Sequence, residues 1–159
     1  MKILIVSDNH GRTGNLEQVI KNQSPIDYLL HAGDTEGTED YIEALLDCPS
    51  AIVSGNNDFF SGLPFELTVK LGKYKVWITH GHMYGIYMGT KRLEKEMEYR
   101  DVDIAVVGHT HMPMIQWCGD KVIVNPGSIS LPRQPGRKPS YMIMEIDRDG
   151  EAHFTICFL

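Results

Sequence analysis

The sequence has few cysteines and no long apolar run. Its three cysteines, Cys48, Cys118 and Cys157, are widely spaced and lie outside every polar cluster, so they do not predict a disulfide framework. We expect them to be reduced packing residues of a cytoplasmic protein. No segment approaches the roughly twenty apolar residues of a membrane span, and Asp8 ends the N-terminal apolar run too early for a signal peptide.

Positive charge is also scarce, since the formal net charge is -6 and no run of lysine and arginine stands out. The protein therefore has little to attract a long polyanion, and we do not expect long nucleic acid as its ligand. With 42% hydrophobic and 23% charged residues, the chain is long enough to bury most of its apolar surface in one core. We expect a single domain over residues 1–159 and no membrane partner.

Apolar runs alternate with helical spacing in the first third of the chain. Residues 3–7 are rich in branched side chains, which is typical of a strand covered on both faces, and helical spacing follows over 16–20. The pattern returns with a strand over 27–31, a helix over 38–46 that begins at an N-cap threonine, and a strand over 51–54. This alternation predicts βαβ units and a parallel sheet.

The rest of the chain is mostly strand. Residues 65–70 and 75–79 flank a turn and predict a hairpin, and a helix over 89–99 leads to a strand over 104–107. Further strands are expected over 114–117, 121–125, 141–146 and 152–158. Together these elements predict an α/β protein in four layers, an α-β-β-α sandwich of two mixed sheets with flanking helices.

Five polar clusters end apolar runs along the chain. They are Ser7-Asp8-Asn9-His10-Gly11, Gly33-Asp34, Gly55-Asn56-Asn57-Asp58, Thr79-His80-Gly81-His82 and Gly108-His109-Thr110-His111. Each cluster alone is more often a turn or an exposed pair of side chains. Ligand sites of α/β sheets lie beyond the carboxyl ends of the strands. Five such clusters in sequence therefore predict one shared polar site.

Carboxylate, amide and imidazole groups in this mixture suit one or two transition-metal ions. Two cations about 4 Å apart repel strongly, and a shared carboxylate reduces that repulsion. We expect Asp34 to be this bridge. The other six ligands divide into Asp8, His10 and His111 for one ion and Asn56, His80 and His109 for the second. Manganese is the expected divalent ion, with nickel, iron or zinc as alternatives.

The order of these clusters resembles that of the calcineurin-like metallophosphoesterases, which have Asp-x-His, Gly-Asp, Gly-Asn-His-Asp/Glu, a single His and Gly-His-x-His. The resemblance extends from Asp8 to the segment Asn125-Pro126-Gly127-Ser128 and is greatest to the small single-domain, YfcE-type phosphodiesterases. It implies a metal-dependent phosphoesterase, more specifically a phosphodiesterase. A hydroxide between two divalent metals would attack the phosphorus of a small phosphoester in line with the departing alcohol.

The same fold occurs in a retromer subunit that acts as a scaffold, so a nonenzymatic docking scaffold is the alternative function. A scaffold has no need of all seven ligands, and this sequence keeps them all, which favours the enzyme. The sequence identifies neither the physiological substrate nor the oligomeric state, and it leaves a homo-oligomer open.

Two candidate catalytic residues lie outside the ligand set. Asn57 stands where much of the superfamily has a histidine thought to protonate the leaving group, and an amide has no titrating proton to give. His82 lies two residues after His80 and either packs beside the ligands or contacts the phosphate. Asp58 is expected to position its loop, and His31 to be a buried strand residue.

Overall fold

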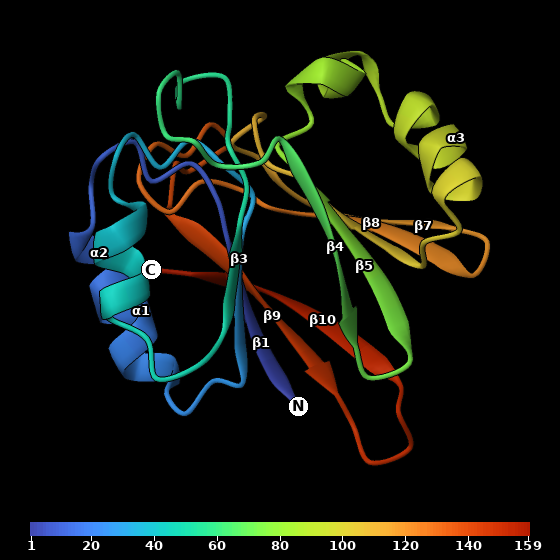
Figure 1. The fold of residues 1–159 in the computed structure, drawn as a ribbon, viewed down its shortest axis with the longest axis horizontal. Helices are drawn as coiled ribbons and strands as arrows, with labels where there is room; N and C mark the ends of the chain where they lie inside the picture. The colour runs from blue at the N-terminus through green and yellow to red at the C-terminus, as the bar shows by residue number, and fades with distance from the viewer.

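The computed structural model describes all 159 residues, which form two five-stranded sheets packed face to face (Figure 1). In chain order the first half contains β1 (Lys2–Val6), α1 (Gly14–Gln23), β2 (Tyr28–His31), α2 (Glu39–Ala44), β3 (Ser50–Ile52), β4 (Glu66–Leu71) and β5 (Tyr74–Thr79). Two 3₁₀ turns follow, η1 (His82–Tyr84) and η2 (Ile86–Met88). The second half contains α3 (Lys91–Arg100), β6 (Ile104–Val106), β7 (Pro113–Cys118), β8 (Lys121–Pro126), β9 (Ser140–Ile146) and β10 (Ala152–Phe158).

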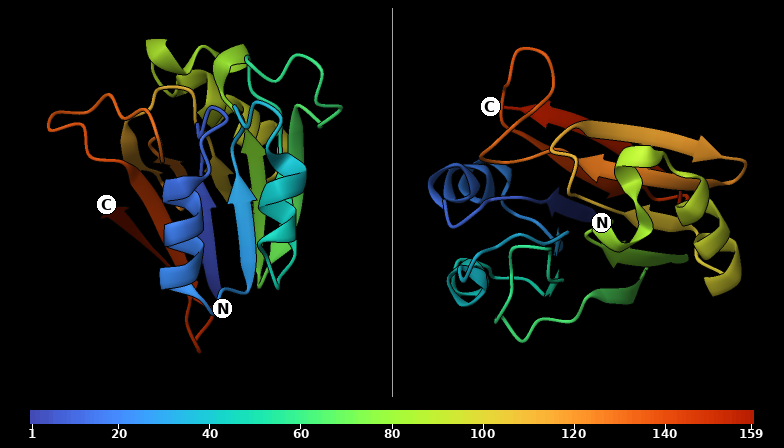
Figure 2. Two further views of the ribbon diagram at one scale, coloured as in Figure 1. Left: turned by 90° about the vertical axis from the view of Figure 1, so that its left-hand side faces the viewer. Right: turned by 90° about the horizontal axis from the view of Figure 1, so that it is seen from above.

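The two sheets are both mixed. The first has the strand order β10-β9-β1-β2-β3, and the second has the order β4-β5-β6-β8-β7. Figure 2 shows α1 and α2 on the outer face of the first sheet and α3 on the opposite side of the molecule, outside the second. The predicted four-layer sandwich is therefore confirmed.

Each sheet contains three parallel strands. In the first sheet β1, β2 and β3 run parallel, and in the second β5, β6 and β8 do so. The loops that follow these strands gather at the upper edge of the sandwich in Figure 1. All five polar clusters of the sequence follow strands of these two sets, so the topology brings them to one edge of the molecule.

Alternating side chains of the strands supply three hydrophobic layers. In β1, Ile3 and Ile5 face the core between the sheets, whereas Leu4 and Val6 pack with α1 side chains such as Leu16. All five of these side chains are fully buried. Because β1 is covered on both faces, its sequence from Ile3 to Val6 is continuously apolar and does not alternate with polar residues.

The helix predicted over 89–99 is present but begins at Lys91 and ends at Arg100. Before it the chain makes the turns η1 and η2, which the sequence pattern does not predict. Gly81, Gly85 and Gly89 adopt positive φ angles around these turns, and so interrupt any regular helix there. None of the helices has the length and apolarity needed for a membrane span.

Candidate metal centre

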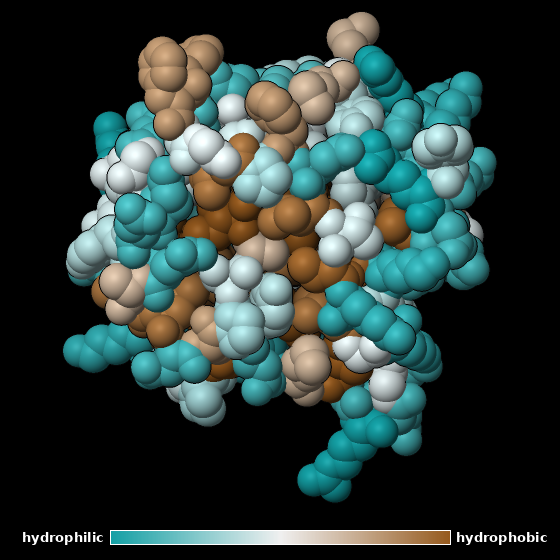
Figure 3. All heavy atoms as spheres, viewed as in Figure 1, coloured by the Kyte–Doolittle hydropathy of each residue, from teal (hydrophilic) through white to brown (hydrophobic).

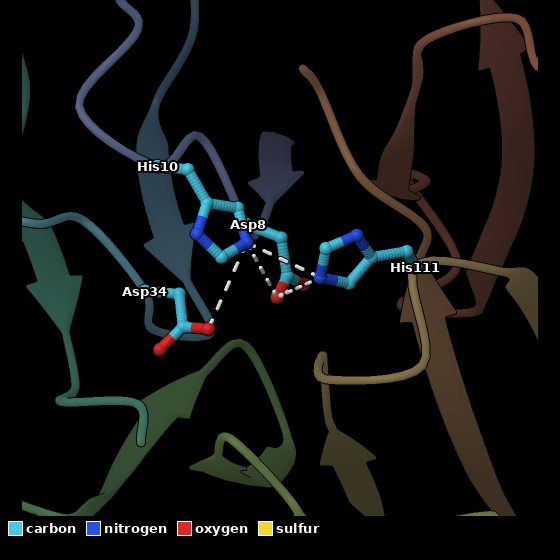
Figure 4. Close-up of side chains that lie close together, drawn as sticks. All are labelled: Asp8, His10, Asp34 and His111. Carbon is cyan, nitrogen blue, oxygen red and sulfur yellow. Dashed lines mark hydrogen bonds and ion pairs between the residues drawn. The ribbon is translucent and has the colours of Figure 1, made fainter. Parts of the chain in front are cut away.

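Four side chains from three of the clusters converge at the upper edge of the sandwich. Asp8, His10, Asp34 and His111 each offer one ligand atom, and these atoms lie within 4.8 Å of one another. Figure 4 shows the four groups pointing toward a common centre. The Nε2 atom of His111 is 3.1 Å from Asp8 Oδ1, and the Nε2 atom of His10 is 3.7 Å from Asp34 Oδ2.

Hydrogen bonds fix which nitrogen of these imidazoles faces the centre. Nδ1 of His10 donates to Glu36 Oε1 at 2.7 Å, and Nδ1 of His111 donates to the Leu131 carbonyl at 2.6 Å. A neutral imidazole that donates through Nδ1 has its lone pair on Nε2. The two Nε2 atoms lie 3.2 Å apart, and the adjacent Asp8 Oδ1 is buried without a hydrogen-bond donor. Lone pairs gathered in this way fit a metal cation.

The second predicted set also adjoins Asp34. His80 donates through Nδ1 to the Ala32 carbonyl at 2.7 Å, which directs its Nε2 atom toward Asn56 Oδ1 at 3.1 Å and Asp34 Oδ2 at 3.4 Å. The His109 ring packs edge-on against that of His80, with 5.1 Å between their centroids. The structure therefore brings all seven predicted ligand residues to one region, with Asp34 Oδ2 within 3.7 Å of one histidine from each set.

Electrostatics at Asp34 and His80 favour positive charge in this region. Burial alone would raise the pKa of Asp34, but the hydrogen bond and charge of His80 and two Asn57 donors hold it well below its usual range. Burial would lower the pKa of His80, yet its contact with Asp34 and the negative charges of Asp8 and Asp34 raise it. Surroundings that stabilise a cation on this imidazole are equally suited to a metal ion.

The pKa values of His109 and His82 are lowered, in contrast to that of His80. Burial, followed by the positive charge of His80, lowers the pKa of His109 to about 4. The same two causes lower the pKa of His82. Both rings are consequently neutral near pH 7, and a neutral imidazole is the form that can bind a metal.

Backbone strain is concentrated in the ligand loops. Asp8, His10, Asp34, His109 and His111 all adopt left-handed φ angles, between 47° and 66°. They make up most of the non-glycine residues with positive φ, a conformation that L-residues seldom adopt. Unfavourable backbone angles of this kind gather at functional sites, where the surrounding structure maintains them. The loops are therefore shaped to present these side chains.

Residues 1–149 match the Calcineurin-like phosphoesterase superfamily domain. The chain belongs to the calcineurin-like phosphoesterase superfamily. It is 35% identical to the probable metallophosphoesterase YsnB of Bacillus subtilis over 150 residues, which are 94% of this chain and 86% of YsnB. It is 29% identical to the phosphodiesterase YfcE of Escherichia coli over an alignment of 171 positions, gaps included, that covers 92% of this chain and 89% of YfcE.

Solved structures of the superfamily have the same fold. A crystal structure of a predicted phosphoesterase from Streptococcus pneumoniae superposes with a TM-score of 0.81 and 29% sequence identity. The superposition covers 99% of this chain and 97% of that one. The sandwich, with its loops at one edge, is therefore the calcineurin-like phosphoesterase fold over its whole length.

Asn57, at the position where the superfamily often has histidine, contacts the carboxylate of Asp34. Its backbone N–H donates to Asp34 Oδ1 at 2.8 Å, and its side-chain amide donates to Asp34 Oδ2 at 2.7 Å. Gly55, two residues earlier, is necessary because an added Cβ would lie 2.1 Å from Asp34 Oδ1. This loop therefore wraps tightly around the carboxylate of Asp34.

Asp58 positions the Asp34 loop, as expected from the sequence. Its Oδ2 accepts hydrogen bonds from the backbone N–H groups of Asp34, Thr35 and Gly55, and its Oδ1 accepts from that of Glu36. Both oxygens are occupied by these donors, which are spread over two loops. Asp58 therefore ties the loop after β3 to the loop after β2.

Three supporting groups were not predicted from the sequence. They are the carboxylate of Glu36 and the carbonyls of Ala32 and Leu131, which accept the Nδ1 protons of the three histidines. A backbone carbonyl has no residue-type signal, so the sequence could not identify two of them. Glu36 lies two residues after Asp34, but an exposed glutamate in a loop is usually only a solvated charge.

His31 is buried, as predicted, and its ring connects two ligand loops. Its Nε2 donates to Asn9 Oδ1 at 3.1 Å, and its Nδ1 accepts the N–H of Gly33 at 3.2 Å. Asn9 in turn donates to the hydroxyl of Thr38 at the start of α2. Burial lowers the pKa of His31 to about 4, so this link is made by a neutral imidazole.

Proposed function

We propose that the protein is a two-metal phosphoesterase that prefers phosphodiesters, with manganese as the expected ion. The observation that carries this proposal is the position of Asp34 Oδ2, which lies 3.7 Å from His10 Nε2 and 3.4 Å from His80 Nε2. One carboxylate oxygen thus faces imidazoles of both ligand sets, as a bridge between two cations requires. Asp8, His10 and His111 would complete one site, and Asn56, His80 and His109 the other.

Two bound divalent ions would acidify a water for in-line attack on phosphorus and neutralise the phosphoryl oxygens. The residues of the chain supply the geometry for this chemistry. Asn57 holds both oxygens of Asp34, and Glu36 and the two carbonyls hold the histidine rings so that each Nε2 points inward. Preorganised groups of this kind lower the barrier because little rearrangement is needed during reaction.

The preference for diesters is inferred from Asn57 and supported by the similarity to YfcE, which is named a phosphodiesterase. Asn57 has no titrating proton, and its amide donates to Asp34. The departing alcohol would then leave with little protonation from this position. Aryl alcohols leave readily as anions, and a diester brings less negative charge to a site that already holds two carboxylates.

A docking scaffold of the same fold is the alternative function. It does not need histidine tautomers fixed by three separate acceptors, nor five ligand residues at left-handed φ angles. These features favour the enzyme because they orient reactive groups. Metal binding alone would fit both functions, so turnover is the measurement that separates them.

The proposal is tested by measuring metal content and turnover on the same preparation. We expect two manganese ions per chain at saturation, loss of activity on chelation, and faster cleavage of bis-p-nitrophenyl phosphate than of p-nitrophenyl phosphate. Binding of at most one ion, with hydrolysis that persists after chelation, would contradict the two-metal site. A clearly faster monoester would contradict the diester preference, and metal binding without any turnover would favour the scaffold.

A further inference from the structure

A cavity of about 550 Å³ opens directly beside the candidate metal centre. Its lining includes Asn56, which contacts His80 Nε2 through its side-chain oxygen, and His82, whose ring centroid is 5.4 Å from that of His80. The rest of the lining comes mainly from the loop between β3 and β4, including Phe59, Leu63 and Phe65. This volume lies within the range of about 300–1,000 Å³ that is usual for small-molecule sites.

The aromatic side chains of this loop are unusually exposed. Phe59 is 79% exposed, Phe65 is 60% exposed, and Phe60 is fully exposed. Figure 3 shows hydrophobic side chains standing out from the upper rim of the molecule, where Figure 1 places the loop between β3 and β4. Apolar groups gathered on a rim are typical of a binding site, because leaving them in water costs free energy.

His82 supplies an unpartnered polar group on the same cavity wall. Its Nδ1 atom is buried and has no hydrogen-bond partner. Buried polar groups are nearly always hydrogen-bonded in folded proteins, so an unpaired one indicates a missing partner. The His82 ring lines the cavity and lies 5.4 Å from the His80 ring and 6.0 Å from the His109 ring, so a phosphoester that reaches both the cavity and the metal centre would pass beside it.

The charge of the lining limits what the cavity can hold. No lysine or arginine lines it, and both oxygens of its one carboxylate, Asp58, already accept backbone hydrogen bonds. A second phosphate or a carboxylate of the substrate would therefore find no counter-ion there. Two phenylalanine rings offer instead an apolar surface against which a planar ring can stack.

We propose that this cavity receives an ester substituent of the substrate, and that the substituent is an uncharged, planar aromatic group. The inference rests on the proposed phosphoesterase function, since it places the phosphorus at the metal centre and the substituent next to Asn56. Stacking on Phe59 and Phe65 would hold the ring, and His82 would hydrogen-bond an oxygen of the ester. A simple aryl group and a nucleobase share this chemistry.

Binding of non-hydrolysable phosphonates tests the cavity without requiring turnover. Phenylphosphonate and methylphosphonate are titrated into manganese-loaded protein by calorimetry. We expect phenylphosphonate to bind about tenfold more tightly, since stacking on an aromatic side chain typically changes affinity by about 5- to 150-fold. A methylene-phosphonate analogue of adenosine 5′-monophosphate forms the second arm. It should bind more tightly than phenylphosphonate if the natural substituent is a nucleoside, and no more tightly if it is a simple aryl group.

Substitutions in the loop between β3 and β4 test whether the preference for phenylphosphonate arises in this cavity. Phe65→Ala and Phe59→Ala should reduce the phenyl-to-methyl ratio to about twofold or less, because both side chains line the cavity. Phe60→Ala should leave the ratio unchanged, since Phe60 belongs to the same loop but does not line this cavity. All three side chains are largely exposed, so their removal should not unfold the protein.

The outcomes separate the cavity from the catalytic function. A phenyl preference that depends on Phe65 in a protein without turnover would support the cavity and contradict the phosphoesterase. If diesters are hydrolysed but phenylphosphonate and methylphosphonate bind equally well, only the proposal for the cavity would be wrong. Absence of phosphonate binding would likewise overturn that proposal alone. If Phe59→Ala and Phe60→Ala both changed the oligomeric state without changing the ratio, the aromatic rim would be an interface between copies of the chain, and the proposal would be wrong.

Discussion

At the scale of single residues, the most constrained side chain is Asp34. It is almost fully buried, its two oxygens accept hydrogen bonds from Asn57, and its Oδ2 faces imidazoles from both ligand sets. A carboxylate can serve these neighbours only while it is ionised, and the contacts that lower its pKa keep it so. Its position explains why one residue should control both candidate metal sites.

Asp34→Asn should be the most damaging single substitution. The neutral amide cannot bridge two cations, and one of its ends would present a donor where Asn57 already donates. We expect activity to fall by at least about 100-fold, since even groups that only orient ligands are worth 10- to 100-fold. Metal content should fall at both sites in elemental analysis. Asp40→Asn, an exposed change in α2, is the control, and near-normal metal and rate in Asp34→Asn would remove Asp34 from the bridge.

Asn57→His tests whether leaving-group protonation is missing at this position. General acid catalysis is typically worth about 10²–10⁴-fold, and we expect histidine to restore part of it for alkyl leaving groups. The gain should be small for p-nitrophenolate, which leaves readily as an anion. Rates of both enzymes are compared over a series of leaving groups of increasing basicity, where the variant should show the weaker dependence.

The structure also supplies a competing outcome for this variant. Because the Asn57 amide donates to Asp34 Oδ2, histidine would lose a contact that holds the Asp34 carboxylate. If that contact is the main role of Asn57, all rates should fall by a similar factor and the dependence on leaving-group basicity should not change. Such a result would rule out the missing-acid explanation.

At the scale of elements, the ligand loops after β1, β2 and β3 are tied together by polar side chains. Asp58 joins the loops after β3 and β2, and the chain of hydrogen bonds through His31, Asn9 and Thr38 joins the loops after β2 and β1 to the start of α2. Thr38 precedes α2 without capping it through its side chain; its hydroxyl instead donates to the Thr35 carbonyl and accepts from the Asn9 amide. These connections hold strained loops that the strands alone would not fix.

Asp58→Asn should loosen two loops at once. An amide offers one acceptor oxygen, and its NH₂ group would face backbone N–H groups that have no other partner. Hydrogen bonds to a charged group contribute about 1.5–3 kcal/mol, so we expect a loss of stability of about that size in urea unfolding. Affinity for manganese should fall as well, although Asp58 is not a ligand. A variant with wild-type stability and affinity would show that the loops hold together without it.

At the scale of the whole molecule, the buried His31 links folding to pH. Its pKa is about 4 in the folded protein and 6.5 ordinarily, so the unfolded chain binds more protons between these values. Stability therefore rises with pH across this window and is lost as the pH falls from about 6.5 to about 4. Acid therefore destabilises the fold, because folding keeps this histidine neutral and the unfolded chain can protonate it.

His31→Gln should remove part of this pH dependence. Between about pH 7 and about pH 5, the metal-free protein should lose about 2 kcal/mol through His31 alone, and the variant should lose that much less. Urea unfolding in the presence of a chelator gives the two values. His153→Gln is the control because His153 is mostly exposed and pairs only with Asp147. Equal losses in wild type and His31→Gln would show that His31 does not determine the acid sensitivity.

Much of the fold could be predicted from the sequence because its signals are local. The continuous apolar run of β1 and the hairpin β4–β5 depend on residues close together in the chain, and both were predicted to within one residue. The turns η1 and η2 were missed because three glycines with positive φ leave no periodic pattern. The region of the candidate site was also predictable, since polar residues that follow buried parallel strands lie together at the carboxyl edge of the sheet.

The sequence by itself therefore determined the fold class, the family and the residues gathered at the site. Only the tertiary structure decided how those residues are oriented: which nitrogen of each imidazole points inward, that Asn57 contacts Asp34, and that a cavity with exposed aromatic side chains opens beside Asn56. The physical reason is the distance along the chain between the residues that determine each property. Hydrophobic periodicity is a property of neighbouring residues, whereas an orientation depends on acceptors such as the Leu131 carbonyl, twenty residues away from the His111 ring that it fixes.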